Sequence, residues 1–257
     1  MTDSEKPVLT ERRDGVLLIT LNRPEARNAV NTALAEGVAA ALDELDADEG
    51  LSVGVLTGAG KGFSAGMDLK AFVTGERPWV GDRGFAGIVQ RASRKPLIAA
   101  IEGFAMAGGL EIALACDLLV VARGAKLGIP ETKRSLVAAG GALLRLPQRI
   151  PYGTAMELAL TGDPIEAERA LEIGLVDRLA EPGQAVEAAI ELARIIAANG
   201  PLALIATKEV LQQQRDWTQE EFWQRQGEIT GPVFASEDAR EGATAFSEKR
   251  EPRWQGR

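Results

Sequence analysis

The 257-residue chain contains no histidine. This absence excludes Ser-His-Asp and Cys-His catalysis, and it excludes zinc or iron sites that depend on His ligands. A general acid or base must therefore be Asp, Glu, Lys, Tyr or Cys. There is one tyrosine, Tyr152, and one cysteine, Cys116, so an intrachain disulfide is impossible. Because Cys116 follows the apolar stretch Ile112-Ala113-Leu114-Ala115, we interpret it as a small packed hydrophobe rather than as a nucleophile.

Long apolar runs are also missing, since none reaches the roughly 18 residues that a membrane span requires. The first seven residues are polar and acidic, without the apolar core of a signal peptide or the Arg-rich pattern of a transit peptide. We therefore expect a cytoplasmic protein with no membrane partner. The chain has a net charge of −8 and so lacks the excess of basic residues that general nucleic-acid binders have. This net charge is still compatible with one small basic pocket for a phosphate-bearing ligand.

Apolar residues alternate between strand and helix spacing along the chain. Short runs rich in β-branched residues predict buried strands at 16–21, 53–57, 97–101 and 118–121. Helical spacing begins after Asn31 or Thr32, which is the expected N-cap, and helices are expected again from Asp68 and from about Leu110. After Pro151 the chain is mainly helical, with predicted helices at 155–160, 167–173, 185–197, 201–214 and 219–231. This layout predicts an α/β fold with a parallel or mixed sheet. We expect one domain, 1–257, with a core at about 1–195 and a C-terminal helical section at about 196–257.

Two glycine-rich loops follow predicted strands, at Gly58–Gly66 and Gly103–Gly109. Phe63 stands where a dinucleotide-binding loop needs its third glycine, and Lys61 is followed by Gly62 rather than Ser or Thr, so neither the dinucleotide nor the Walker A pattern is present. The loops either bring backbone N–H groups close to a ligand or serve only as tight turns. The spacing alone favours neither alternative.

Two glutamates follow these loops. Glu111 is the only charged residue between Glu102 and Asp117, in the first turn of a predicted helix. A carboxylate there is either buried, which raises its pKa and suits a general acid or base, or exposed and stabilised by the helix macrodipole. Glu131 follows Pro130 and could act with Glu111 or simply cap the next helix.

Four segments, in order, resemble the crotonase (enoyl-CoA hydratase/isomerase) superfamily. They are Leu21-Asn22-Arg23-Pro24-Glu25-Ala26-Arg27-Asn28-Ala29, Gly60-Lys61-Gly62-Phe63-Ser64-Ala65-Gly66-Met67-Asp68-Leu69, Ala107-Gly108-Gly109-Leu110-Glu111-Ile112-Ala113-Leu114-Ala115-Cys116-Asp117, and Leu127-Gly128-Ile129-Pro130-Glu131 continuing to Arg145-Leu146-Pro147. The similarity extends from about Gly15 to the end. It implies a spiral of ββα turns with a C-terminal helical trimerisation section, assembled as homotrimers or dimers of trimers.

The same resemblance implies a function. In the hydratases of the family, the positions matched by Glu111 and Glu131 are both glutamate and hold a water molecule between them. The backbone N–H groups of Met67 and Gly108 would form an oxyanion hole for the thioester carbonyl, which suits the enolate-like charge that develops there. Contacts to substrate or coenzyme A (CoA) would come from Ala26, Arg27, Ala65, Asp68, Leu69 and Lys249. The implied reaction is reversible syn addition of water to a trans-2-enoyl-CoA, in fatty acid or lipid metabolism. CoA is then part of the substrate, and neither a metal nor a permanently bound cofactor is expected.

Other members of the superfamily supply the alternatives. Within it the chain also resembles carnitinyl-CoA dehydratase (crotonobetainyl-CoA hydratase), through Gly84-Phe85-Ala86-Gly87 and through tail segments at 236–239, 246–250 and 254–257. Double-bond isomerisation is a further alternative, although isomerases of the family usually keep only the second glutamate. A noncatalytic binding protein with the same fold is the competitor from another class. Ser135, Ala138 and Ala142 depart from the usual Gly and Pro of the family, which concerns the shape of the acyl pocket.

Overall fold

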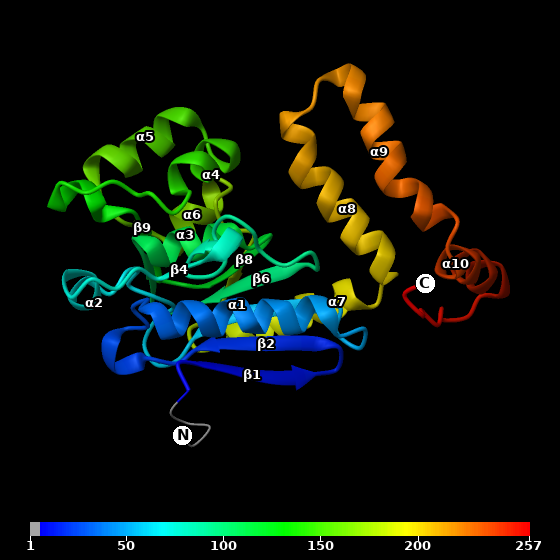
Figure 1. The fold of residues 1–257 in the computed structure, drawn as a ribbon, viewed down its shortest axis with the longest axis horizontal. Coiled ribbons are helices and arrows are strands. Elements are labelled where there is room, and N and C mark those ends of the chain that lie inside the picture. Colours follow the sequence, from blue (N-terminus) through cyan, green and yellow to red (C-terminus); the bar gives the residue numbers. More distant parts are fainter. Residues whose placement is uncertain (1–5) are drawn as a thin grey trace.

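The computed structural model describes residues 6–257, and its centre is a six-stranded sheet in the order β1-β2-β3-β6-β8-β11 (Figure 1). β1 (Val8–Arg13) is antiparallel to β2 (Val16–Leu21), and the remaining pairs are parallel, through β3 (Val53–Gly58), β6 (Leu97–Ile101), β8 (Leu118–Ala122) and β11 (Arg178–Ala180). Parallel strands are covered on both faces and so need nearly continuous apolar sequence. The predicted α/β class and its mixed sheet are confirmed.

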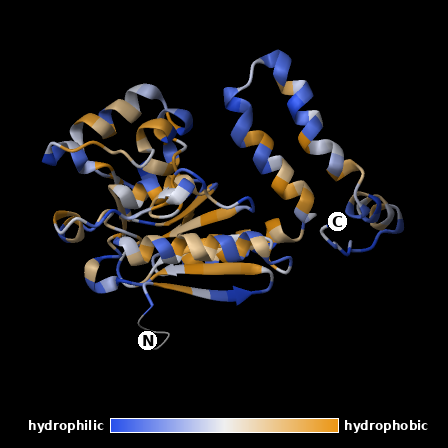
Figure 2. Ribbon diagram, viewed as in Figure 1, coloured by the Kyte–Doolittle hydropathy of each residue, from blue (hydrophilic) through white to orange (hydrophobic). Residues whose placement is uncertain are grey.

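The two faces of this sheet pack against different helices. Leu17 and Ile19 of β2 belong to the hydrophobic cluster that includes α1 (Thr32–Ala47), whereas Val16 and Leu18 pack with α7 (Ala185–Ala197). Successive strand residues point to opposite faces, and β6 alternates in the same way. Figure 2 shows these strands mostly in the orange of hydrophobic residues. Burial of each such large aliphatic side chain contributes about 1.5–3 kcal/mol.

A second sheet gives the chain its spiral path. β7 (Phe104–Met106) follows β6 and pairs with β9 (Lys126–Gly128), which follows β8, and β10 (Ile165–Glu166) completes the order β10-β9-β7. β7 is followed by α3 (Gly108–Ala115), and β9 is followed by the 3₁₀ helix η4 (Pro130–Arg134) and α4 (Ala142–Arg149). Each turn therefore places one strand in each sheet and then returns through helical structure. This is the spiral of ββα turns that the resemblance implied.

Several element boundaries differ from the prediction. The segment Phe104–Met106 is a strand rather than part of a loop, because it pairs with β9 and because Ala105 also bridges Ser64. α3 begins at Gly108, two residues before the expected start, and α4 and β1 were not predicted. The other helices lie close to the predicted ranges: α2 (Leu69–Val73), α5 (Tyr152–Thr161), α6 (Ala167–Glu172), α8 (Pro201–Gln213) and α9 (Gln219–Phe234). The last helix, α10 (Glu237–Glu248), was not predicted.

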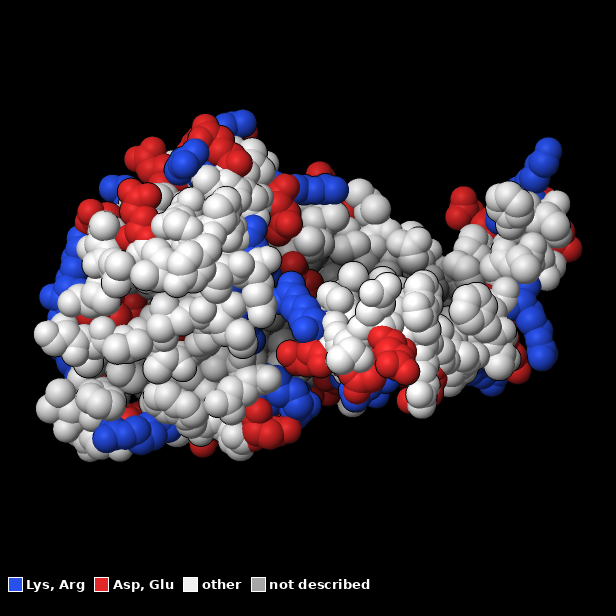
Figure 3. Space-filling model, turned by 90° about the horizontal axis from the view of Figure 1, so that it is seen from above, with Lys and Arg blue, Asp and Glu red and all other residues white. Residues whose placement is uncertain are grey.

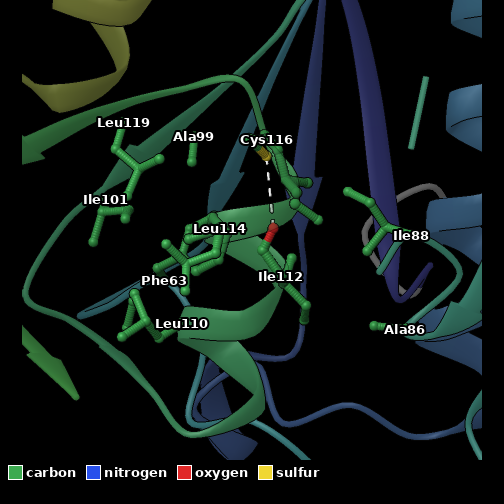
Figure 4. Close-up of a cluster of buried hydrophobic side chains, with 14 of the residues drawn as sticks. Phe63, Ala86, Ile88, Ala99, Ile101, Leu110, Ile112, Leu114, Cys116 and Leu119 are labelled. Atoms are coloured by element: carbon green, nitrogen blue, oxygen red, sulfur yellow. Dashed lines mark hydrogen bonds between the residues drawn. The ribbon is translucent and has the colours of Figure 1, made fainter. Parts of the chain in front are cut away.

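Cys116 lies at the end of α3 inside the larger hydrophobic cluster, close to Ile112 and Leu114 (Figure 4). Its thiol donates only a weak 3.7 Å hydrogen bond to the carbonyl of Ile112. Burial raises the pKa of the Cys116 thiol to about 12, so the thiolate needed for nucleophilic chemistry is not formed near neutral pH. The interpretation of Cys116 as a packed hydrophobe is confirmed.

The C-terminal helices extend away from the sheet (Figure 1). The buried Lys208 of α8 connects them to the core, because its ammonium donates to the carbonyl of Lys95 at 2.8 Å and pairs with Asp117 at 2.6 Å. No residue of α9 is buried, and Trp223, Phe234 and Phe246 are among the exposed large hydrophobic residues.

No single helix in residues 6–257 has the length and apolar composition of a membrane span. The one combination that passes these criteria joins α7 to residues 201–216 and is bent by 107°.

Candidate active site

A cavity of about 440 Å³ lies where the two glycine-rich loops, η4 and the hairpin of β4 (Trp79–Val80) and β5 (Gly84–Phe85) meet. Its wall includes Arg27, Ala65, Met67, Leu69, Gly108, Glu111 and Glu131 from the sequence prediction. The rest of the wall is largely apolar and comes from Trp79, Phe85, Phe104, Met106, Ala107, Pro130, Arg134, Leu136, Val137, Ala139 and Gly140. A concave, apolar site with a few convergent polar groups is typical of a small-molecule site.

Glu111 is buried, with only 4% of its surface exposed. It lies in the first turn of α3, yet its Oε1 accepts hydrogen bonds from outside this helix, from the N–H groups of Gly140 (2.7 Å) and Ala142 (3.1 Å). Burial raises the pKa of the Glu111 carboxyl, and the two N–H donors and Arg145 oppose this shift. Of the two alternatives left open by the sequence, the buried carboxyl is therefore the correct one.

Glu131 lies in the first turn of η4 and faces the same cavity. Burial raises its pKa, and the nearby negative charge of Glu111 raises it further. Among residues 6–257, its buried Oε2 has no hydrogen-bond partner. Two carboxyls in one apolar cavity, each with an elevated pKa, can hold and exchange a proton near neutral pH more readily than exposed carboxyls.

The two glycine-rich loops meet at Gly66. Its backbone has φ +89°, and a Cβ added there would lie 2.7 Å from the nitrogen of Gly108. Val30 forms an isolated β-bridge with Met67. It donates to the carbonyl of Gly66 and accepts from the N–H of Asp68, so this bridge does not use the N–H of Met67. Gly108 is the first residue of α3, and the first N–H groups of a helix have no acceptor within it. The contact thus brings two candidate oxyanion donors together at the cavity.

The first loop is held by the N-terminal motif. The buried Asn28 donates from its side-chain amide to the carbonyls of Ala59 and Gly62, both at 2.9 Å. In return, the hydroxyl of Ser64 donates to the carbonyl of Asn28 at 2.8 Å. These hydrogen bonds fix the loop and place Arg27 at the cavity wall.

Three residues of the prediction lie outside the cavity wall. Ala26 is half-buried in the 3₁₀ helix η2 (Pro24–Ala26). Asp68 caps α2 by accepting from Lys70 and Ala71, and it pairs with Arg23 at 3.1 Å. Lys249 is exposed at the end of α10, in the left-handed backbone region with φ +56°. The assignment of these three residues to CoA binding stays a prediction.

Sequence reasoning missed several contributors to the site. Gly140 and Ala142 hold Glu111 through their backbone, which no side-chain pattern reveals. Trp79 and Phe85 pack against each other with ring centroids 5.3 Å apart and line the cavity. Arg134 also lines the cavity. Its position three residues after Glu131 could have indicated that the two side chains lie on the same side of a helical turn. Across residues 6–257, no three carboxylate or cysteine side chains gather as a metal site would require.

Known proteins resemble this chain over nearly its whole length. Residues 11–257 match the family model described as enoyl-CoA hydratase/isomerase. The chain is 43% identical to the enoyl-CoA hydratase EchA19 of Mycobacterium tuberculosis, covering 99% of this chain and 98% of that protein. It is 41% identical to the carnitinyl-CoA dehydratase of Salmonella arizonae, covering 95% and 97%. A crystal structure of an enoyl-CoA hydratase from Mycobacterium tuberculosis is similar with a TM-score of 0.96 and 59% identity, over 98% of this chain and all of that one.

Proposed function

The chain belongs to the enoyl-CoA hydratase/isomerase family, and on that premise we propose that this hydro-lyase reversibly adds water to a trans-2-enoyl-CoA thioester. The observation that carries the proposal is the meeting of Glu111 and Glu131, both with raised pKa, at one cavity beside the N–H groups of Met67 and Gly108.

The two carboxyls divide the proton transfers. In hydration, ionised Glu111 takes a proton from a water molecule while the oxygen of that water bonds to the β-carbon of the substrate. Protonated Glu131 donates its proton to the α-carbon. In dehydration the roles reverse. The two hydrogen bonds from Gly140 and Ala142 orient Glu111, while the unpartnered Oε2 of Glu131 leaves an oxygen for this exchange.

The N–H groups of Met67 and Gly108 act on the thioester. As the β-carbon is attacked, negative charge moves to the carbonyl oxygen, and two preorganised donors stabilise the charge where it develops. The start of α3 adds a favourable field, because the partial positive charge of the helix lies at Gly108. The apolar wall excludes water and strengthens these interactions.

CoA would lie along the side of the cavity formed by Arg27 of the N-terminal motif and by Ala65 and Leu69, with Ala26 and Asp68 as neighbours of Arg27 and Leu69 in the chain. CoA is then part of the substrate, and no permanently bound cofactor is required for this chemistry. Arg27 at the wall supplies positive charge for the phosphates.

We also propose a homotrimer, alone or doubled to a hexamer. α9 buries no residue within one chain, and Trp and Phe are enriched at subunit interfaces. Seen from above, the part of the molecule that contains α4 and α5 shows a broad uncharged area (Figure 3). Leu144 of α4 and Tyr152 and Leu160 of α5 are exposed. In such an oligomer, Lys249 would reach the CoA of a neighbouring subunit.

Dehydration of carnitinyl-CoA is the second candidate, supported by the relative of that name at 41% identity. Isomerisation and noncatalytic binding are less well supported, because both glutamates are present and face one cavity. Hydration of crotonyl-CoA, followed as loss of the absorbance of the conjugated thioester, tests the main proposal. We expect turnover by the wild-type enzyme, whereas no detectable hydration of crotonyl-CoA or longer enoyl-CoA substrates would refute it.

A further inference from the structure

The 3₁₀ helix η4 carries three hydrophilic residues directly after Glu131, and they face two sides. Thr132 donates to the carbonyl of Ala159 at 3.2 Å, and Lys133 pairs with Asp163. Both are therefore directed toward α5 and the turn that follows it. In a 3₁₀ helix, residues i and i+3 lie above one another, so Arg134 is placed on the side of Glu131. Arg134 accordingly lines the cavity.

Arg134 and Arg27 are the two cations on the cavity wall, and of the two Arg134 lies beside Glu131. Within the described part of the chain, neither guanidinium makes a salt bridge or a hydrogen bond, and the positive charge of Arg134 partly offsets the rise in the pKa of the Glu131 carboxyl. By contrast, Lys133 is neutralised by Asp163. An always-charged group with five donors and no acceptor is thus available beside Leu136 and Val137 at the cavity wall.

We propose that Arg134 is a specificity-determining residue that selects acyl groups by charge, favouring a carboxylate at the distal end of the acyl chain and disfavouring a quaternary ammonium. The inference rests on the proposed function, in which CoA follows the Arg27 side of the cavity. The acyl chain then extends past Glu131 toward Arg134 and Val137. A guanidinium matches the geometry of a carboxylate and repels a fixed cation.

This assignment separates the two candidate functions. A carnitinyl thioester carries a quaternary ammonium, which an unpaired arginine at the acyl wall opposes. The residue therefore favours neutral or carboxylate-bearing enoyl-CoA substrates over the carnitinyl substrate, although the chain is 41% identical to a carnitinyl-CoA dehydratase.

Binding of saturated thioesters tests the inference without requiring hydration. The probes are butyryl-CoA, glutaryl-CoA and 4-(trimethylammonio)butanoyl-CoA, titrated calorimetrically at low ionic strength because salt screens charges. Arg134→Gln should weaken glutaryl-CoA and strengthen the trimethylammonio probe, each about fivefold relative to butyryl-CoA, as for a partly exposed charge pair. Arg134→Lys should retain the wild-type order of affinities. Lys133→Gln, which removes a neighbouring charge directed toward α5, should leave the ratios unchanged.

The outcomes distinguish this inference from the proposed function. If Arg134→Gln changes all three affinities by one factor, or if Lys133→Gln alters the ratios equally, charge selection by Arg134 is wrong even when crotonyl-CoA is hydrated. If the ratios change as expected while the wild-type enzyme hydrates no enoyl-CoA, the hydratase proposal fails and the charge selection stands. Failure of all three probes to bind the wild-type enzyme would overturn both.

Discussion

Gly66 should be indispensable for catalysis, because it sets the approach of the two loops that carry Met67 and Gly108. Its φ of +89° is unfavourable for any other residue, at a cost of about 1–3 kcal/mol. A Cβ in Gly66→Ala would also lie 2.7 Å from the nitrogen of Gly108, 3.0 Å from the Cβ of Ala107 and 3.1 Å from the carbonyl oxygen of Met106. The loops must therefore separate by several tenths of an ångström.

The separation displaces Gly108 from the carbonyl oxygen that it would stabilise. Misplacement by about 1 Å costs roughly 10²-fold in rate, and loss of one oxyanion donor costs about 10²–10³-fold in kcat. We expect kcat for crotonyl-CoA hydration to fall by about 10²-fold in Gly66→Ala. Steady-state hydration kinetics, with thermal unfolding to confirm that the variant is folded, provide the measurement.

Gly183→Ala is the matched control. Gly183 has φ +81°, and a Cβ there would meet nothing within 4 Å. It lies in the loop before α7, away from the cavity wall. The control therefore carries the same kind of backbone cost without separating the loops, and it should lose stability but retain kcat. If Gly66→Ala retained kcat, or if both variants lost it equally, the contact between the loops would not determine the position of the donors.

Glu111→Gln and Glu131→Gln should each lower kcat by about 10²-fold or more, and near-normal turnover by both would end the two-carboxyl mechanism. The pH profile of hydration should be bell-shaped, with its acid limb above the ordinary carboxyl pKa of 4.5, because Glu111 must be ionised and Glu131 protonated while burial raises both pKa values; an acid limb at or below 4.5 would contradict this. A raised carboxyl pKa makes the folded state lose stability as pH rises above 4.5. The stability of Glu131→Gln relative to wild type should therefore increase from pH 4.5 to pH 8 in denaturant titrations, and a difference that does not change with pH would contradict this. Arg27→Ala and Lys249→Ala should raise KM for the CoA substrate at low salt, and light scattering should show a trimer or hexamer; a fully active monomer would refute the shared site at Lys249.

The central strands could be predicted because parallel strands that are covered on both faces consist of uninterrupted apolar residues, as in Leu97–Ile101. β1 has no such apolar run, because its sequence Val-Leu-Thr-Glu-Arg-Arg is mostly exposed or half-buried. Its pairing with β2 makes it a strand despite its charged composition. β7 was likewise decided by pairing partners that are distant in sequence.

The site was predictable only in part, for the same reason. The sequence around Glu111 was consistent with both a buried and an exposed carboxylate. The groups that settle the matter, the N–H groups of Gly140 and Ala142, come 29 and 31 residues later. No periodicity connects these positions, and the pairing of Glu111 with Glu131 came from resemblance rather than from spacing.

The alternation of β6 side chains between two hydrophobic clusters divides the molecule into layers that can evolve separately. Ala99 and Ile101 face the cluster that includes α3, the helix carrying Glu111, whereas Ile98 and Ala100 face the cluster that includes α7. A substitution at Ile98 therefore changes the packing against α7, while one at Ala99 changes the packing against the helix that carries Glu111. Neighbouring positions of one strand therefore affect different layers, and the α7 side can be repacked for stability without altering the packing around Glu111.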